Sequence, residues 1–278
     1  MPELPELQAH AERLDTAYAG ATLARFRPLS FTALKTAVPP PEEADGQPLV
    51  FVGRRGKYLL LDFGTVTFVV HLMQGGRLRD DPKRAAKPRG GVARWELDDG
   101  RALLLTEPGT ERRAGVWVVA GDPEEADPLA GLGPEADRLG VEAMTRLLDE
   151  HPMRLHGFLR DQRILSGLGR RLANEVSHRA RLSPFASTKK LGAESVERLV
   201  EAVGTCVNET LAVERGRDDL GSVKDRPGAV HGRTGEPCAV CGDAVRAVSY
   251  RSHTVNYCAT CQTGGRVLAD NTTSKFLK

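Results

Sequence analysis

The chain has 278 residues, of which 40% are hydrophobic and 27% are charged, and its formal net charge is +2 at pH 7. These proportions are typical of a globular protein, and so small a net charge does not by itself indicate a nucleic-acid partner. No apolar run approaches the roughly 20 residues that cross a bilayer, and no signal-peptide pattern opens the sequence. We therefore expect a cytoplasmic protein of two or three domains with no membrane partner.

The first 20 residues predict a helix that begins within an unusual opening sequence, MPELPE. Pro5 suits a first helical position, where its missing N–H costs nothing. Glu3 and Glu6 complement the positive end of the helix dipole, and apolar residues then recur at helical spacing. This pattern explains the helix but not Pro2, whose secondary amine would become the end of the chain if Met1 were removed.

Residues 21–120 change to a strand pattern. Segments such as LVFVGRRGKYLLLDF, VTFVVHLM and RALLLTE alternate or run apolar, with turn signals between them. The pattern predicts a β-sandwich or a flattened barrel, followed by an acidic, Pro-rich linker at 121–137. Lys57 follows Gly56 and precedes an apolar strand. It is either a solvated lysine at a strand end, which is the common case, or a functional group.

Helical spacing dominates residues 138–214, and a polar, Gly-rich loop follows at 215–236. Within the helical part, GLGRRLANE (167–175) places two glycines between two helical patterns. Such a pair is most often a tight turn, but a helix N-terminus beside arginines is also suited to bind phosphate. The surrounding segment 154–181 carries seven arginines. It predicts either a polyanion-binding patch or a solvated helix face.

The C-terminal part carries two CxxC pairs separated by sixteen residues: Cys238, Cys241, Cys258 and Cys261. Two CxxC turns can bring four thiolates around one metal in a closed tetrahedral site, so we expect one structural Zn²⁺. A disulfide framework is not expected in the cytosol. The alternation in AVRAVSY predicts a hairpin between the two turns. Cys206 stands alone in an apolar segment and is expected to be a buried core residue.

Six motifs follow one another along the chain: MPELPE, GRRGKYLLLDF, HLMQGGRL, TERRAGVWVV, LRDQRILSGLGRRLANE and VHGRTGEPCAVC…YCATCQ. In this order they resemble the formamidopyrimidine-DNA glycosylase/endonuclease VIII family of base-excision repair enzymes, nearly from end to end. The resemblance implies an α+β fold with an N-terminal helix and β-sandwich (1–130), a helix–two-turn–helix domain (131–222) and a C-terminal zinc ribbon (223–278). It also implies a monomer at the bacterial nucleoid that binds damaged double-stranded DNA.

The family's catalytic residues fall on the first and second motifs. Loss of the initiator methionine exposes a nucleophilic proline in this family, which points to Pro2. The resemblance assigns general acid/base work at the sugar to Glu3, a supporting role to Glu6, and a phosphate contact that assists catalysis to Lys57. An amine that attacks C1′ of a flipped nucleotide forms an iminium, as lysine does in Schiff-base enzymes. We therefore expect a bifunctional DNA glycosylase/AP lyase that cleaves the strand by β,δ-elimination.

The resemblance also implies DNA contacts. Gln74 holds the position where the family usually has a void-filling methionine, and Met73 precedes it, although Met73 is equally explained by core packing. Arg112 would face the base that is left unpaired when its partner flips out. Ala114 holds the position of a phenylalanine that, in the family, inserts between bases. The other implied DNA-contacting positions are Gly167, Gly169, Arg170, Arg251 and His253.

Three of the basic positions depart from the family pattern. Arg170 replaces an asparagine, His156 a lysine and His253 an arginine, and a histidine that is mostly uncharged at neutral pH gives a weaker phosphate contact. We expect the chemistry to be retained, with altered lesion choice or DNA grip. An alternative is a protein of the same fold that recognises distorted or abasic DNA without cutting it. A third interpretation is a zinc-ribbon protein unrelated to repair, in which MPELPE is a chance match.

Overall fold

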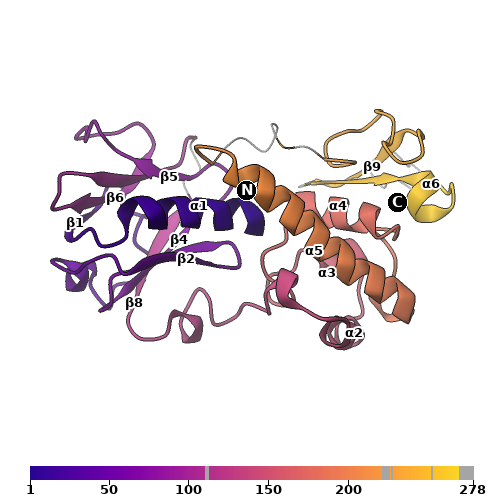
Figure 1. Ribbon diagram of the computed structural model, residues 1–278, viewed down its shortest axis with the longest axis horizontal. Coiled ribbons are helices and arrows are strands. Elements are labelled where there is room, and N and C mark those ends of the chain that lie inside the picture. The colour runs from indigo at the N-terminus through magenta and orange to yellow at the C-terminus, as the bar shows by residue number, and fades with distance from the viewer. Residues whose placement is uncertain (110–112, 221–225, 227, 252, 269–278) are drawn as a thin grey trace. The chain divides into compact units, whose positions relative to one another are not determined.

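The computed structural model describes residues 1–278 except 110–112, 221–225, 227, 252 and 269–278. The chain folds as two compact units (Figure 1). The first comprises Met1–Leu132 with Leu211–Val223, and the second comprises Gly133–Thr210 with Lys224–Lys278. The three domain ranges expected from the sequence stay a prediction.

The first unit consists of helix α1 (Leu4–Tyr18) and two antiparallel four-stranded sheets. One sheet has the strand order β1-β6-β7-β5, with bounds Leu23–Pro28, Gly91–Leu97, Ala102–Thr106 and Arg77–Asp80. The other has the order β2-β3-β4-β8, with bounds Phe51–Arg55, Tyr58–Asp62, Thr67–His71 and Gly115–Val119. Short 3₁₀ turns are η1 (Pro41–Ala44) and η2 (Pro123–Glu125). The N-terminal helix and the β-sandwich predicted from the sequence are both confirmed.

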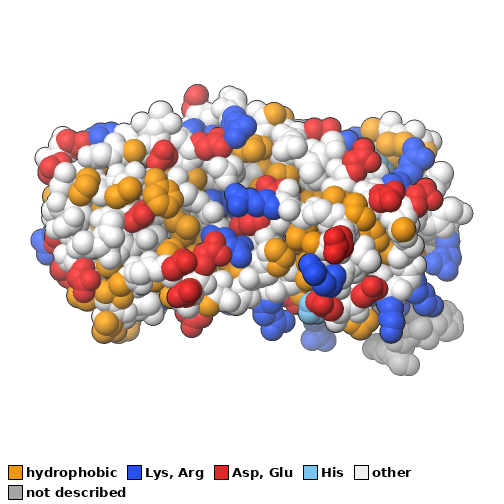
Figure 2. Space-filling view, turned by 60° about the horizontal axis from the view of Figure 1, so that its bottom comes forward, with side chains coloured by type: hydrophobic (Ala, Val, Ile, Leu, Met, Phe, Trp, Pro, Cys, Tyr) orange, Lys and Arg blue, Asp and Glu red, His pale blue; other side chains and the backbone are white. Residues whose placement is uncertain are grey.

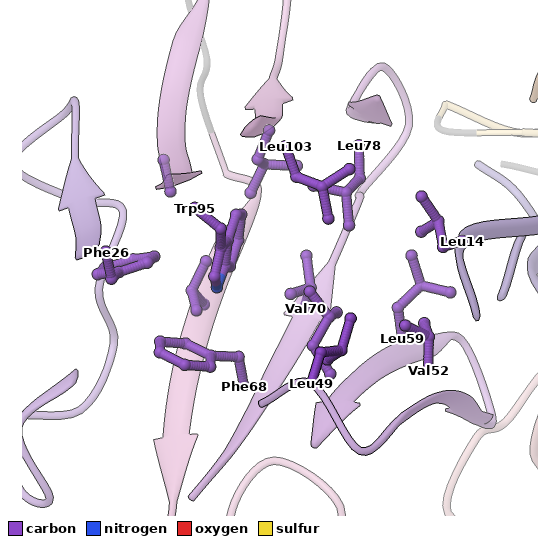
Figure 3. Close-up of a cluster of buried hydrophobic side chains, with 14 of the residues drawn as sticks. Leu14, Phe26, Leu49, Val52, Leu59, Phe68, Val70, Leu78, Trp95 and Leu103 are labelled. Atoms are coloured by element: carbon purple, nitrogen blue, oxygen red, sulfur yellow. The ribbon is translucent and has the colours of Figure 1, made fainter. Parts of the chain in front are cut away.

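The core of the first unit is formed by the inner faces of both sheets and by α1 (Figure 3). Phe26 and Trp95 from one sheet meet Phe68 from the other, with ring centroids 5.1–5.8 Å apart. Figure 3 also shows Leu14 of α1 beside Leu59 of β3. Large aromatic side chains bury much apolar surface and pack edge to face, so this cluster joins the two sheets into one core.

Strand β3 is apolar on both faces because both of its faces are covered. Leu59 and Leu61 belong to the central core, whereas Leu60 packs on the outer face with Val69 and Leu129. Leu129 comes from the segment 121–137, which the sequence pattern predicts to be a linker. The segment therefore covers the outer face of the sheet through apolar residues such as Leu129 and Leu132.

The second unit contains helices α2 (Val141–Glu150), α3 (Leu155–Phe158) and α4 (Arg170–Arg179), together with α5 (Ala193–Arg215) as far as Thr210. Strands β9 (Val245–Ser249) and β10 (Thr254–Cys258) pair antiparallel, and α6 (Ala259–Thr263) follows. The 3₁₀ turns η3 (Ala136–Arg138) and η4 (Thr188–Lys190) also belong here. The hairpin predicted between the two CxxC turns is confirmed.

The helix expected over LHGFLRDQRIL is shorter than predicted. Only α3, four residues long, is helical there, and turns follow. The Asp161 carboxylate accepts the backbone N–H of Arg163 at 3.1 Å. Side chains of this kind offer the backbone an alternative to helical hydrogen bonds, so the apolar spacing alone gives the wrong length.

Charged side chains of both signs are interspersed on the surface that Figure 2 shows. This mixture agrees with the small net charge of +2. Over the described parts of the chain, no helix is both long and apolar enough to cross a membrane.

Candidate active site and metal centre

The start of α1 is held by a capping box. The backbone N–H of Glu3 donates to Oε2 of Glu6 at 2.7 Å, and the Glu3 carboxylate accepts the backbone N–H of Glu6 in return. Glu3 is 5% exposed and Glu6 is 0% exposed. Reciprocal capping of this kind satisfies backbone donors that a helix leaves free. It fixes the chain directly after Pro2, at a place where most termini fray.

Pro2 is buried, and Met1 before it has 38% of its surface exposed. While Met1 is attached, the nitrogen of Pro2 is part of a peptide bond and is no nucleophile. Removal of Met1 would both uncover this nitrogen and convert it to a secondary amine. The chemistry that the sequence predicts for Pro2 therefore depends on processing of the first residue.

Lys57 lies in the tight turn between β2 and β3, next to Gly56, whose φ of 54° favours glycine. Its side chain is buried, with 5% of the residue exposed. Burial, followed by the positive charges of Lys57 and of the N-terminal amino group, lowers the pKa of His71 to about 4. Since such charge effects act over short distances, the chain terminus, Lys57 and His71 share one region of the first unit.

His71 is a site residue that the sequence reasoning did not single out. It ends β4 directly opposite Tyr58, and the two rings lie 4.7 Å apart. Its Nδ1 also lies 2.8 Å from Sδ of Met73. The available signal was its place at the head of HLMQGGRL, directly after an apolar strand.

The two predicted void-filling residues, Met73 and Gln74, lie in the turn after β4 and differ in burial. Met73 is half-buried against the core and has a φ of 54°, which is strained for a residue with a side chain. Gln74 is exposed. Gly76 closes the turn, because a Cβ there would lie 2.1 Å from the carbonyl oxygen of Leu72. Gln74 is therefore the more exposed of the two side chains.

A buried carboxylate organises the loop before β8. Glu107 Oε2 accepts the backbone N–H groups of Arg113 and Ala114, each at 2.6 Å. Ala114 is 1% exposed and belongs to the core of the first unit. Arg112, the residue expected to face an orphaned base, lies outside the described residues. Glu107 is a positioning residue that its place in TEPGTERRAG does not reveal.

In the second unit, the glycine pair forms a turn whose shape is fixed by one side chain. Gly167 has a φ of 97°, and Gly169 is the N-cap of α4. The amide of Gln162 accepts the N–H of Gly167 at 3.0 Å and donates to the carbonyls of Leu168 and Arg160 at 2.8 and 2.9 Å. Gln162 thus holds the turn that presents the N-terminus of α4.

A basic pocket of about 780 Å³ lies in the same unit. Its described lining contains three arginines, Arg154, Arg160 and Arg266, and no Asp or Glu. The rings of His156 and His253 are parallel, 5.9 Å apart, and that of Tyr250 stacks on His253 at 4.8 Å. Such a lining favours an anion or a stacked base.

Both histidines of this pocket are held neutral. Burial, followed by Arg160 and His253, lowers the pKa of His156 to about 3. Partial burial, followed by Arg160 and Arg170, lowers the pKa of His253. Arg170, at the start of α4, therefore lies close enough to His253 to influence its pKa. Arg251 is exposed in the turn between β9 and β10.

The cysteine module brings its thiols together. Sγ of Cys238 lies 3.9 Å from Sγ of Cys261, and Sγ of Cys241 lies 3.4 Å from Sγ of Cys258. Bond lengths of about 2.3 Å to a tetrahedral ion separate sulfur ligands by roughly 3.8 Å. The donors therefore fit a zinc-type site. The backbone N–H groups of Val240 and Cys241 and the side chain of His178 outweigh burial and lower the pKa of Cys238 to about 6.

His178 of α4 is a further donor that the cysteine spacing could not predict. Its Nε2 lies 3.3 Å from Sγ of Cys238. The ligand atoms of His178, Cys238, Cys258 and Cys261 all lie within 4.8 Å of one another. These residues form a cluster that can hold a metal ion.

Comparisons with known proteins agree with this arrangement. Residues 1–117 match the family model described as "Formamidopyrimidine-DNA glycosylase N-terminal domain". The formamidopyrimidine-DNA glycosylase of Bordetella parapertussis is 32% identical over 94% of this chain and 99% of its own. That of Thermus thermophilus is 34% identical over 95% and 100%. The crystal structure of the MutM (Fpg) protein from Thermus thermophilus has a TM-score of 0.80 at 30% identity and covers 94% of this chain and 98% of that one.

The chain is an enzyme of the DNA glycosylase class, because its β-sandwich unit, its helical unit with a cysteine hairpin and its similarity to named glycosylases agree. The chain belongs to the formamidopyrimidine-DNA glycosylase family. The family resemblance inferred from the motifs is thereby confirmed. A Lactococcus lactis Fpg solved with DNA containing an abasic site has a TM-score of 0.79 at 20% identity, which bears on the fold alone.

Proposed function

We propose that the chain is a bifunctional DNA glycosylase/AP lyase in which the amine of Pro2, freed by removal of Met1, is the nucleophile. The single observation that carries this proposal is the buried start of α1, whose capping box fixes Glu3 directly after Pro2. The capping box gives both of these buried carboxylates hydrogen-bond partners. They are suited to proton transfer next to a fixed amine.

The chemistry follows from these groups. The nitrogen lone pair of Pro2 attacks C1′, and the damaged base leaves with the electrons of its bond to C1′ and takes up the proton that the Pro2 nitrogen loses. Glu3 gives its proton to the ring oxygen of the sugar, which opens the ring and leaves an iminium on Pro2. Loss of a proton from C2′ expels the 3′ phosphate, and a second elimination expels the 5′ phosphate. Water then releases the sugar fragment and restores the amine.

Damaged double-stranded DNA is the partner in this proposal, and the chain acts as a monomer. Phosphates would be contacted by the turn at Gly167 and Gly169 with Arg170, and by His253 of the basic pocket. Arg251, in the turn between β9 and β10, would add a further phosphate contact. Gln74 or Met73 would fill the gap left by a flipped nucleotide, and Arg112 would face the unpaired base. Solved relatives of this fold are complexes with DNA that contains Fapy-dG or an abasic site.

The four cysteines would hold one structural Zn²⁺, which fixes the hairpin and takes no part in bond breaking. Cys238 and Cys258 are 2% and 0% exposed, so a metal there is closed to substrate.

Borohydride trapping on abasic-site DNA tests the proposal. We expect a covalent adduct whose mass-mapped attachment point is Pro2, in a protein whose intact mass lacks Met1. The adduct should persist in Lys57→Gln, which removes a neighbouring alternative amine. An adduct mapped elsewhere would remove Pro2 from its role. Intact DNA binding without incision of any abasic substrate would instead support a non-cleaving protein of the same fold.

A further inference from the structure

The metal centre of the second unit holds more donors than a zinc ion uses. In the described part of the chain, four thiols and the Nε2 of His178 gather at one place. A structural zinc is almost always four-coordinate. One of the five donors must therefore stand outside the coordination sphere when the other four are bound.

The five donors differ in how they are protected from solvent. Cys238, Cys258 and His178 are 2%, 0% and 5% exposed, and Cys261 is half-buried. Cys241 alone among these five donors is exposed. The mutually close group consists of His178 with Cys238, Cys258 and Cys261, and does not include Cys241. The donor most open to solvent is thus the one that the imidazole could replace.

We propose that His178 is a reserve ligand of this site. When four thiolates hold the metal, the Nε2–H of His178 donates to Sγ of Cys238, an outer contact that orients and stabilises the thiolate. When Cys241 is lost from the site, the imidazole takes the fourth position, which gives a Cys₃His set, itself a common structural zinc site. In this exchange Cys241 leaves as a thiol with the proton that Nε2 of His178 gives up, and Nδ1 takes one proton from water, so the imidazole binds as a neutral ligand.

The packing around α4 keeps the imidazole in place for this exchange. Gln262 accepts the backbone N–H of Cys258 at 2.8 Å and donates to the carbonyl of Leu182, also at 2.8 Å. It therefore ties the second CxxC turn to the segment that follows α4. The position of His178 beside the thiols does not depend on Cys241, so loss of that cysteine leaves the other four donors together.

Metal content and the visible spectrum of the Co²⁺-substituted full-length protein test this proposal. We expect Cys241→Ser to retain one metal per chain, with thiolate-to-cobalt charge-transfer intensity about three quarters of the wild-type value, since three thiolates remain of four. The control Cys241→Ser/Cys258→Ser, which leaves only three of the five donors, should lose the metal. The double variant Cys241→Ser/His178→Gln should lose it as well.

His178→Gln alone keeps four cysteines and should remain folded and metal-loaded. We expect it to release zinc to a chelator roughly 10- to 100-fold faster, the usual effect of removing an outer hydrogen bond. The proposal is wrong if Cys241→Ser loses its metal as completely as Cys241→Ser/Cys258→Ser, or if adding His178→Gln leaves the metal affinity of Cys241→Ser unchanged. These readouts need no DNA incision, so they stay separate from any failure of the proposed enzyme activity.

Discussion

Two carboxylates at the start of α1 are removed from water, yet each has hydrogen-bond partners. Glu6 accepts the backbone N–H of Glu3, and Glu3 accepts that of Glu6. A buried carboxylate without such partners would be strongly destabilising. The capping box makes the burial tolerable and at the same time fixes the residue next to Pro2.

Glu6 therefore offers a test that separates capping from charge. We expect Glu6→Ala to lower the free energy of unfolding by about 1–2 kcal/mol and to weaken borohydride trapping, because the backbone at Glu3 loses its acceptor. Glu6→Gln should recover most of the stability, since glutamine also serves in a capping box. Equal loss in both variants, measured by urea unfolding, would show that the charge matters and the cap does not.

His156 gives the stability of the second unit a dependence on pH. Its pKa in the folded state is about 3, owing to burial and then to Arg160 and His253. In the unfolded chain a histidine takes up its proton near pH ~6.5. Between these values the unfolded state binds more protons, so stability falls as pH falls from about 6.5 towards 3.

At pH ~5 this effect amounts to about 2 kcal/mol for one such group. We expect the wild type to lose about that much more stability than His156→Gln between roughly pH 7 and pH 5, as measured by urea unfolding at each pH. His151→Gln, at a partly exposed histidine on the C-cap of α2, is the control and should behave like the wild type. Identical pH slopes for the wild type and His156→Gln would contradict the prediction.

At the scale of elements, α4 organises the second unit because its polar residues are buried as well as its apolar ones. Glu175, 9% exposed, accepts the backbone N–H groups of Ala229, Val230 and His231 at 2.7–3.1 Å. The same helix begins at the glycine turn and carries His178 beside the cysteines. One helix thus connects the candidate phosphate site, the end of the long polar loop and the metal centre.

Glu175→Gln should loosen that loop end. Glutamine has one acceptor oxygen for three donors, so we expect a loss of about 2–3 kcal/mol, the scale of hydrogen bonds to a charged group. Amide hydrogen exchange at residues 229–231 should accelerate more than exchange in α5. Glu197→Gln, at an exposed position of α5, should change neither quantity. Unchanged protection at 229–231 would remove Glu175 from this anchoring role.

At the scale of the whole molecule, binding to DNA must come from local patches, because the net charge is only +2. The basic pocket supplies one such patch, but its two histidines are neutral at physiological pH. A protein with fewer cations near the DNA phosphates releases fewer counterions when it binds. The affinity for DNA should therefore depend on salt less steeply than it would with lysine and arginine at these positions.

His253→Arg restores a fixed charge at the pocket. We expect tighter binding to abasic-site duplex at neutral pH and a plot of log affinity against log salt that is steeper by about one. His151→Arg adds the same charge at a residue that does not line the pocket and should change the slope little. Fluorescence anisotropy over a salt series measures both. An equal slope for His253→Arg and the wild type would place His253 away from DNA phosphates.

The sequence by itself determined the elements whose signals are local. The helix start at Pro5, the strand alternation and the CxxC spacing each depend on neighbours within a few residues, so their geometry can be read from spacing. The family's motifs also placed Pro2, Glu3 and Lys57, although their roles remain proposals. Apolar spacing predicted too long a helix at α3, because the Asp161 side chain takes a backbone hydrogen bond that a helix would need.

The contacts that His71, Glu107, Gln162 and His178 make near the candidate sites are visible only in the folded structure. His178 meets Cys238 across 60 positions of sequence, and Glu175 meets Ala229 across 54. No spacing rule connects residues so far apart, because their contact depends on how α4 packs against the hairpin. The packing of α4 also places His178 beside the cysteines as a fifth donor. In the first unit, the packing of Leu129 on Leu60 of β3 makes the segment 121–137 a cover for the sheet.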